Sequence, residues 1–159
     1  MDPLLDLLQN NALASHADLA AQLDTTPEEV AHRIAAYEEQ GVILGYRTVI
    51  DAEKAGEQMV TAVIEVKITP EREGGFDRMA DRIAKFEQVQ SCYLMSGGYD
   101  LLVFVEGPSL REVASFVSEK LSPLGGVLST ATHFRLKTYK ENGILLGGPE
   151  KAERLAVSP

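Results

Sequence analysis

A glycine-rich turn in the second half of the chain carries groups that could bind a small zwitterion. The run Ser96-Gly97-Gly98-Tyr99-Asp100 lies between two stretches of strand-forming residues. Two glycines permit positive φ angles and bring backbone N–H groups close to a bound anion, such as the carboxylate of an amino acid. Asp100 could pair with the α-ammonium group or fix the turn, and Tyr99 could cover an apolar side chain or simply pack. Taken alone, Gly-Gly between strands is most often only a hairpin.

A second candidate surface belongs to a helix predicted between Thr26 and Gly41, whose apolar stripe is Val30, Ile34 and Tyr37. The opposite face is of the kind that could enter a DNA major groove, although groove readers commonly present Arg, Lys, Asn or Gln. Arg33, on the border, could touch phosphate or brace the domain through a nearby carboxylate. The DNA-binding candidates on this helix and in the segment that follows it are His32, Arg33, Ala36 and Arg47.

The charge of the chain argues against strong DNA binding. The 159 residues include 15 basic and 24 acidic ones, for a net charge of −9. Residues 1–50 hold two basic and eight acidic residues, or −6, and residues 51–159 hold only −3. Because phosphate neutralisation normally supplies much of DNA affinity, we expect each DNA-reading head to bind weakly. Several heads linked in an oligomer, or a site chosen by its shape, could restore binding.

Other functional classes find little support in the residues. The three histidines, His16, His32 and His133, have no metal-ligand spacing, and neither a P-loop nor a G-x-G-x-x-G pattern occurs. Cys92 falls inside a predicted strand, where burial makes a thiol inert. We therefore expect no catalytic activity, no cofactor and no metal. The start of the chain lacks a basic signal region and no stretch approaches the roughly 18 apolar residues of a membrane span, which predicts a cytoplasmic protein without membrane contact.

The elements that must position these residues change character near residue 50. Pro3, Ser15 and Thr26 mark the starts of three helices, the last with a T-x-x-E capping box, and such close spacing is typical of a helix-turn-helix unit. Gly45-Tyr46, with strand-forming residues on both sides, predicts a small β-hairpin or wing that completes a domain at 1–50. Residues 51–58 are expected to form a linker.

Residues 59–140 alternate strand and helix in the order βαββαβ, which is the ferredoxin-like arrangement of an α+β fold. The strands are expected at 59–68, 89–95, 99–106 and 128–139. On the last of these, Thr130 and Thr132 share a face and could offer hydroxyls to a ligand, although threonine is also a good strand former. In the tail, 141–159, the Asn142-Gly143 pair predicts a tight turn, and 149–156 could make a short helix.

One face of this sheet is expected to lie open and yet to be partly apolar. Met59, Thr61 and Val63 would point away from the helices. On the third strand, one of two sets must join them, either Leu101/Val103/Val105 or Leu102/Phe104. A half-apolar open sheet needs a partner that covers it, and self-association is the simplest one.

Taken together, these features resemble the Lrp/AsnC (leucine-responsive, feast/famine) family of transcriptional regulators. The matching residues are Leu19-Ala20, Val30, Arg33 and Ile34, the run from Glu38 to Gly45-Tyr46, the turn Ser96–Asp100, and Thr132. The resemblance implies a winged helix-turn-helix domain at 1–50 and an effector-binding, oligomerising domain of the RAM type at 59–140. It also implies a bacterial or archaeal regulator that forms homodimers through its sheets. In this family dimers often assemble into octamers and bind an amino acid where they meet.

The expected function is therefore that of an amino-acid-responsive DNA-binding transcriptional regulator. The expected ligand-binding residues are Ser96, Gly97, Gly98, Tyr99, Asp100 and Thr132. The alternative is an amino-acid sensor that has lost most of its DNA affinity and acts through a protein partner, because the acidity is concentrated where the resemblance implies DNA contact.

Overall fold

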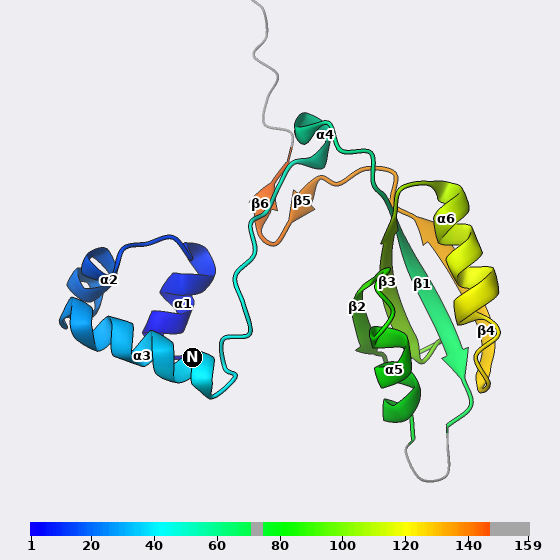
Figure 1. The fold of residues 1–159 in the computed structure, drawn as a ribbon, viewed down its shortest axis with the longest axis horizontal. Coiled ribbons are helices and arrows are strands. Elements are labelled where there is room, and N and C mark those ends of the chain that lie inside the picture. Colours follow the sequence, from blue (N-terminus) through cyan, green and yellow to red (C-terminus); the bar gives the residue numbers. More distant parts are fainter. Residues whose placement is uncertain (71–74, 147–159) are drawn as a thin grey trace, which may run out of the picture. The chain divides into compact units, whose positions relative to one another are not determined.

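The structure is a computed structural model that describes residues 1–70 and 75–146. The chain divides into two compact units, Met1–Thr48 and Val49–Pro159, which are described one at a time (Figure 1). The expected boundary was residue 50. Within the described residues, no helix has the length and apolar character needed to cross a membrane. The helix expected at 149–156 lies outside the described residues.

The first unit contains three short helices, as predicted: α1 (Pro3–Asn10), α2 (His16–Leu23) and α3 (Pro27–Glu39). Each begins at a side-chain cap, since Asp2, Ser15 and Thr26 accept backbone N–H groups of the first turns. The turn between α2 and α3 passes through Asp24, which has a left-handed φ of 51°. Aspartate tolerates this conformation because its short polar side chain can form local hydrogen bonds. The five buried side chains of this unit are Leu4, Leu8, Leu19, Ala20 and Val30.

The end of α3 fixes the start of the segment that follows it. Gly41 has a φ of +68°, and the N–H groups of Gly41 and Val42 donate to the carbonyls of Glu38 and Tyr37 at 3.1 and 2.8 Å. This is the Schellman arrangement that a glycine after a helix permits. The sequence-based helix end at Gly41 is confirmed.

The predicted hairpin at residues 42–50 does not form. The segment is irregular, with no strand pairing. A hairpin would have to return residues 47–50 onto residues 42–44 directly after Gly45-Tyr46. Instead, the Tyr46 hydroxyl donates to Glu38 Oε1 at 3.0 Å, which ties the expected turn to the end of α3 and leaves the following residues to continue onward.

The second unit begins with a one-turn helix, α4 (Ala52–Ala55), inside the expected linker. Its sheet contains β1 (Val60–Ile68), β2 (Val89–Leu94), β3 (Leu101–Gly107) and β4 (Val127–Phe134), all antiparallel in the order β2-β3-β1-β4. The connections carry α5 (Asp77–Ala84) and α6 (Leu110–Ser115), the latter continued by a π-helical turn, η1 (Phe116–Leu121). The predicted βαββαβ order is confirmed.

The fourth strand is shorter than expected. It was predicted to reach residue 139, but it ends at Phe134, and one further backbone bond joins the Arg135 N–H to the Thr61 carbonyl at 2.9 Å. The reason lies in its neighbour: β1 starts at Val60, which this register places opposite Leu136, so the residues after Leu136 have no strand to pair with. Leu136, at this limit of the sheet, is 93% exposed.

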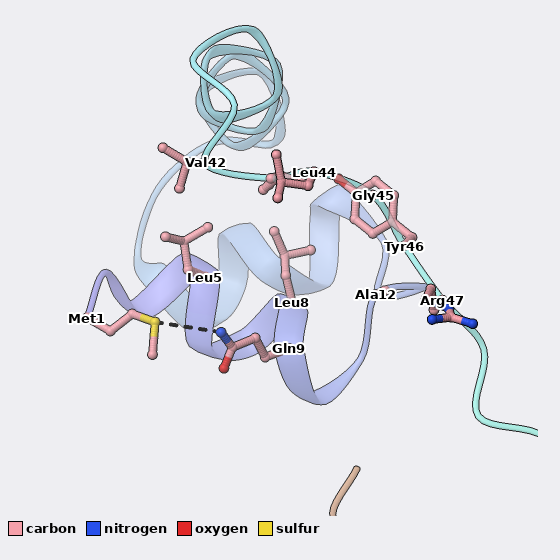
Figure 2. Close-up of a pocket in the computed structure, with 11 residues that line it drawn as sticks. Met1, Leu5, Leu8, Gln9, Ala12, Val42, Leu44, Gly45, Tyr46 and Arg47 are labelled. Carbon is pink, nitrogen blue, oxygen red and sulfur yellow. Dashed lines mark hydrogen bonds between the residues drawn. The ribbon is translucent and has the colours of Figure 1, made fainter. Parts of the chain in front are cut away.

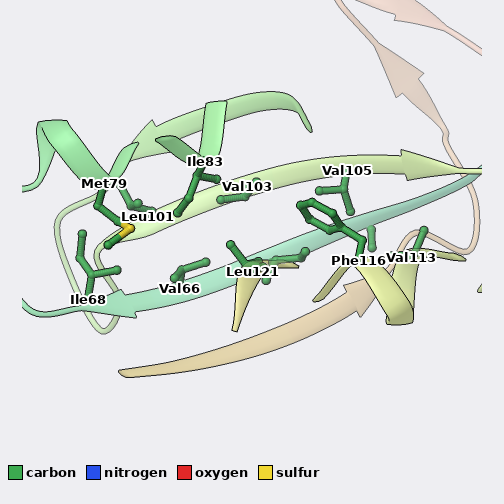
Figure 3. Close-up of a cluster of buried hydrophobic side chains, with 12 residues drawn as sticks. Val66, Ile68, Met79, Ile83, Leu101, Val103, Val105, Val113, Phe116 and Leu121 are labelled. Atoms are coloured by element: carbon green, nitrogen blue, oxygen red, sulfur yellow. The ribbon is translucent and has the colours of Figure 1, made fainter. Parts of the chain in front are cut away.

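The core of the second unit lies between the sheet and its helices (Figure 3). Alternate residues of β1, from Ala62 to Ile68, are buried as predicted, and α5 and α6/η1 cover them with Met79, Ile83, Val113, Phe116 and Leu121. In β3, Leu101, Val103 and Val105 are fully buried. This decides the alternative left open by the sequence, because Leu102 and Phe104 must then lie on the other face.

The tail closes with a small hairpin of β5 (Lys140–Glu141) and β6 (Ile144–Leu145). Asn142 and Gly143 form its turn with φ angles of +45° and +84°. Two positive φ angles are characteristic of the type I′ turn that Asn-Gly favours. The turn predicted from this pair is confirmed.

Candidate functional site

The glycine-rich turn joins β2 to β3 and is fixed by Asp100. The Asp100 Oδ2 atom accepts the Ile68 N–H at 2.8 Å, while its own N–H donates to the Val66 carbonyl at 3.0 Å. The Asp100 carbonyl also accepts the Met95 N–H at 2.8 Å across the turn. Asp100 therefore fixes the turn against the end of β1, which was one of its two expected roles, and leaves Oδ1 as the oxygen free of this bond.

The rest of the turn faces solvent. Ser96, Gly97 and Gly98 are exposed and Tyr99 is half-buried. Gly97 has a φ of +135°, in a region that favours glycine, whereas Gly98 has no positive φ. Only one of the two glycines is thus required by the backbone conformation.

Thr132 lies away from this turn within one chain. Thr132 stands opposite Ile64 of β1, and Ile64 stands opposite Val103 of β3. Thr132 is therefore level with the middle of β3 and is separated from it by β1. Thr132 shares the helix-covered face with Thr130, whose hydroxyl is 3.3 Å from Ser122 Oγ. The structure therefore brings together Ser96 to Asp100 but does not bring Thr132 to them.

Arg33 takes part in an ion pair inside the first unit. Its Nη2 atom lies 2.6 and 2.8 Å from the two carboxylate oxygens of Asp2, and the Tyr37 hydroxyl donates to the same carboxylate. Asp2 Oδ1 also accepts the Leu4 N–H at 2.8 Å as the cap of α1. Of the two roles considered for Arg33, the geometry favours bracing the domain over touching phosphate.

Sequence reasoning missed Asp2 and Tyr37 as polar partners. A signal for Asp2 was present, because an aspartate directly before Pro3 is typical of a helix start. No spacing rule, however, relates residue 2 to residues 33 and 37.

The hydrogen bonds of this cluster raise the pKa of Arg33 and also shift the pKa values of Asp2 and Tyr37. The pKa of Asp2 is lowered, first by the Tyr37 hydroxyl, then by the Leu4 N–H and by Arg33. The pKa of Tyr37 is raised, chiefly because its hydroxyl donates to Asp2. Both shifts favour the state in which Asp2 is charged and Tyr37 is neutral.

The stability of the first unit is therefore expected to depend on the ionisation of Asp2. Because its folded pKa lies below the ordinary 3.8, its contribution is fully present above that pH and is lost as the pH falls through the folded value. Urea unfolding should show that Asp2→Asn lowers the midpoint at neutral pH and that this loss shrinks in acid, with Asp6→Asn as the exposed control. A loss of the same size at all pH values would contradict this origin.

The other DNA-binding candidates lie on the surface. His32 is exposed on α3, Ala36 is half-buried, and Arg47 is exposed in the segment after α3. Arg47 stands at the end of an open groove of about 380 Å³ between α1 and residues 42–47. Figure 2 shows Leu5 and Leu8 of α1 pointing toward Val42 and Leu44 of that segment. Since Arg33 is paired, Arg47 is the basic side chain of the first unit that remains for phosphate.

The open face of the sheet combines apolar side chains with paired polar ones. Val63 stands opposite Phe104, and Tyr93 stands opposite Leu102, with the rings of Tyr93 and Phe104 edge-to-face at 6.0 Å. Around them, His133 Nε2 lies 3.4 Å from Glu65 Oε1. Arg135 Nη2 donates to the Thr61 hydroxyl at 2.8 Å. This face has the composition of a surface that another apolar face can cover.

The comparisons with known proteins agree with these two units. Residues 61–145 match the model of the Lrp/AsnC ligand binding domain, and residues 4–43 match a winged helix-turn-helix DNA-binding model. The chain belongs to the Lrp/AsnC family. It is a DNA-binding transcriptional regulator with a ligand-binding domain, and the regulators of this family are not enzymes.

Three relatives illustrate the similarity of this Lrp/AsnC chain. It is 44% identical to YugG, an uncharacterized HTH-type transcriptional regulator of Bacillus subtilis, over 98% of this chain and 95% of YugG. It is 30% identical to a proline dehydrogenase transcriptional activator of Rhodobacter capsulatus, over 87% and 89% of the two chains. The feast or famine regulatory protein of M. tuberculosis shares its fold, with a TM-score of 0.68, 23% identity and coverage of 87% and 90%.

Cys92 and the metal-ligating residue types were considered in the sequence for other chemistry. Cys92 is half-buried, and burial raises the pKa of its thiol, which lowers its reactivity. Within residues 1–70 and 75–146, the structure brings together no group of three His, Cys, Asp or Glu side chains that could hold a metal ion.

Proposed function

We propose that this Lrp/AsnC regulator responds to an amino acid bound at the turn Ser96–Asp100, between subunits of an oligomer. The observation that carries this proposal is the turn itself, in which the exposed residues Ser96, Gly97 and Gly98 lie close in sequence to the Asp100 carboxylate. Backbone N–H groups suit the ligand carboxylate, and Asp100 Oδ1 suits its ammonium group. The M. tuberculosis relative, which was solved in complex with L-methionine, supports a ligand of this class.

Self-association through the open sheet face is part of this proposal. The face carries Val63, Tyr93, Leu102 and Phe104, of which Tyr93 is 52% exposed. Covering such a patch with its own copy gives a symmetric dimer, the commonest oligomer of soluble proteins. Dimers could then assemble into octamers and place the turns of neighbouring dimers against each other.

DNA binding in this proposal is weak for each head and depends on assembly. Within residues 1–48 the basic side chains are Arg33 and Arg47, and Arg33 is held by Asp2. One remaining guanidinium neutralises little phosphate charge, so the salt dependence contributed by each head is expected to be shallow. Linked heads multiply weak contacts.

The effector site is tested by a thermal-shift screen of the L-amino acids against the wild type and Asp100→Asn. The asparagine oxygen can still accept the Ile68 N–H, so the turn keeps its bond while the charge is lost. A stabilising amino acid should bind Asp100→Asn at least about tenfold more weakly, a difference of about 1.4 kcal/mol. Asp81→Asn, exposed on α5, is the matched control.

Two results would count against this assignment. An undiminished shift in Asp100→Asn would move the ammonium site elsewhere, and no shift of the wild type with any amino acid would remove the proposed responsiveness.

A second candidate function is favoured by the acidity of the first unit. A regulator whose heads carry −6 over residues 1–50 could act through a protein partner rather than through DNA. Footprinting of the wild type on genomic fragments distinguishes the two. Protection at defined promoters supports the first proposal, whereas no protection at any salt concentration, together with a protein recovered by pull-down, supports the second.

A further inference from the structure

Tyr37 stands where three parts of the first unit meet. Its hydroxyl donates to Asp2, which begins α1. Its carbonyl accepts the N–H groups of Val42 and Ile43 at 2.8 and 3.1 Å, and its ring packs against the buried cluster of the unit. One residue therefore joins the start of α1, the end of α3 and the start of the segment that carries Arg47.

Arg33 strengthens the same connection one turn earlier on α3. Residues four apart share one helix face, so Arg33 and Tyr37 reach the Asp2 carboxylate together, with Arg33 contacting both oxygens. We call Asp2, Arg33 and Tyr37 the Asp2 cluster. Its members are only partly exposed, with 27% of the Asp2 side chain and 30% of the Arg33 side chain accessible, so the pair is screened less than an ion pair in open water.

Apolar packing alone gives α3 few anchors. Val30, in its first half, is the buried residue of this helix, whereas Ile34 and Tyr37 are partly buried. The backbone of α3 lies mainly against α2, and α1 packs chiefly on α2 as well. The orientation of the second half of α3 relative to α1 therefore depends on the Asp2 cluster.

We propose that the Asp2 carboxylate is a positioning group for DNA reading, which holds α3 and the Arg47 segment in the orientation that binds DNA. The inference rests on DNA binding by the helix-turn-helix unit. It predicts the opposite of what net charge alone predicts, because removing a negative charge from an acidic DNA-binding unit should strengthen binding to phosphate. Positioning predicts the opposite sign, so the two effects can be separated by experiment.

The test compares Asp2→Asn with Asp6→Asn in the full chain. Asparagine caps helices about as well as aspartate, so the Leu4 N–H keeps an acceptor. The amide, however, has no charge for Arg33 and can accept through only one of its two terminal atoms. Asp6 is exposed on the same helix and its replacement changes the charge equally.

The probe is a fluorescein-labelled duplex that the wild type enriches from a random library, measured beside its scrambled version. Asp2→Asn is expected to bind the enriched duplex about tenfold or more weakly and to lose preference over the scrambled one, while Asp6→Asn binds as well as the wild type or better. Tyr37→Phe, which removes one hydrogen bond, should show a smaller loss of the same sign. Circular dichroism verifies that each variant is folded at the assay temperature.

Hydrogen exchange gives a readout that does not need DNA. In Asp2→Asn the amides of residues 33–43 should exchange faster than in Asp6→Asn, because the end of α3 and the Val42 and Ile43 bonds have lost their support.

The outcomes separate this inference from the one on which it rests. If Asp2→Asn is folded and binds the enriched duplex as tightly as Asp6→Asn, the positioning role is overturned, even where its melting temperature falls. If Asp2→Asn does not fold, Tyr37→Phe becomes the deciding variant, and unchanged DNA binding by Tyr37→Phe overturns the positioning role. If the wild type enriches no duplex, DNA reading itself fails and the positioning role falls with it.

Discussion

Phe104→Glu is expected to make the protein monomeric and to remove most of its affinity for DNA. Phe104 lies on the open face of the sheet, opposite Val63 on one side and Ser91 on the other. A carboxylate at this position would be buried without a partner when a second copy covers the face, which costs several kcal/mol per ion. Its neighbours Val103 and Val105 point into the core, so the fold of the monomer should persist.

The expected loss of DNA affinity is about 10²- to 10⁴-fold, because linked sites gain that much over single ones. Light scattering after gel filtration measures the mass, and titration of a labelled duplex measures the affinity. Ala114→Glu is the control, since Ala114 is exposed on α6 and this change also adds one negative charge to the second unit.

Each result has a separate consequence. An oligomeric Phe104→Glu would mean that the copies associate through another surface. A monomeric Phe104→Glu that binds DNA as tightly as the wild type would mean that single heads suffice, in spite of the charge of residues 1–50.

The elements of this fold could be predicted from local patterns because local physics determines them. Val60 to Ile68 alternate along β1, and Ser15 and Thr26 cap their helices as their positions indicated. Which side chains of β3 face the helices could not be predicted, since both alternating sets, Leu101/Val103/Val105 and Leu102/Phe104, are apolar. Only the helices that cover one face decide between them.

The errors at 42–50 and at the end of β4 have tertiary causes. The residues after Gly45-Tyr46 have good strand propensity, but the Tyr46 hydroxyl binds Glu38 at the end of the preceding helix. The residues after Leu136 were likewise predicted to continue the strand, but they lack a neighbour to pair with, because β1 begins at Val60. Propensity is overridden where the partner strand is missing.

The residues of the candidate sites could be named from the sequence, but their hydrogen-bond and ion-pair partners could not. The sequence allowed two roles for Arg33, contact with DNA phosphate or an ion pair that braces the domain. Asp2, the partner in the ion pair that the structure shows, lies 31 positions away. The sequence also allowed two roles for Asp100, ligand binding or fixing the turn. The Ile68 N–H that Asp100 accepts lies 32 positions away. Separations of this size leave no periodic signal along a chain.

Ile64→Ala is expected to destabilise the second unit by about 2–5 kcal/mol, the usual cost of removing a buried isoleucine side chain to Cβ. Ile64 is fully buried at the centre of the sheet, between Val103 of β3 and Thr132 of β4. The loss contains both the transfer of the removed methyl and methylene groups and the cavity that they leave. Since small domains are stable by only about 5–15 kcal/mol, this change removes a large fraction of the total.

Val63→Ala is the matched comparison, because Val63 is the adjacent residue of β1 on the opposite face. Chemical denaturation at several protein concentrations distinguishes the two. The Ile64→Ala loss should not depend on concentration, since it arises inside one chain, whereas Val63→Ala should weaken self-association and so lose stability mainly where the wild type is associated. A concentration-independent Val63→Ala loss as large as that of Ile64→Ala would mean that the open face is as tightly packed within one chain as the core, and that no second copy is needed to cover it.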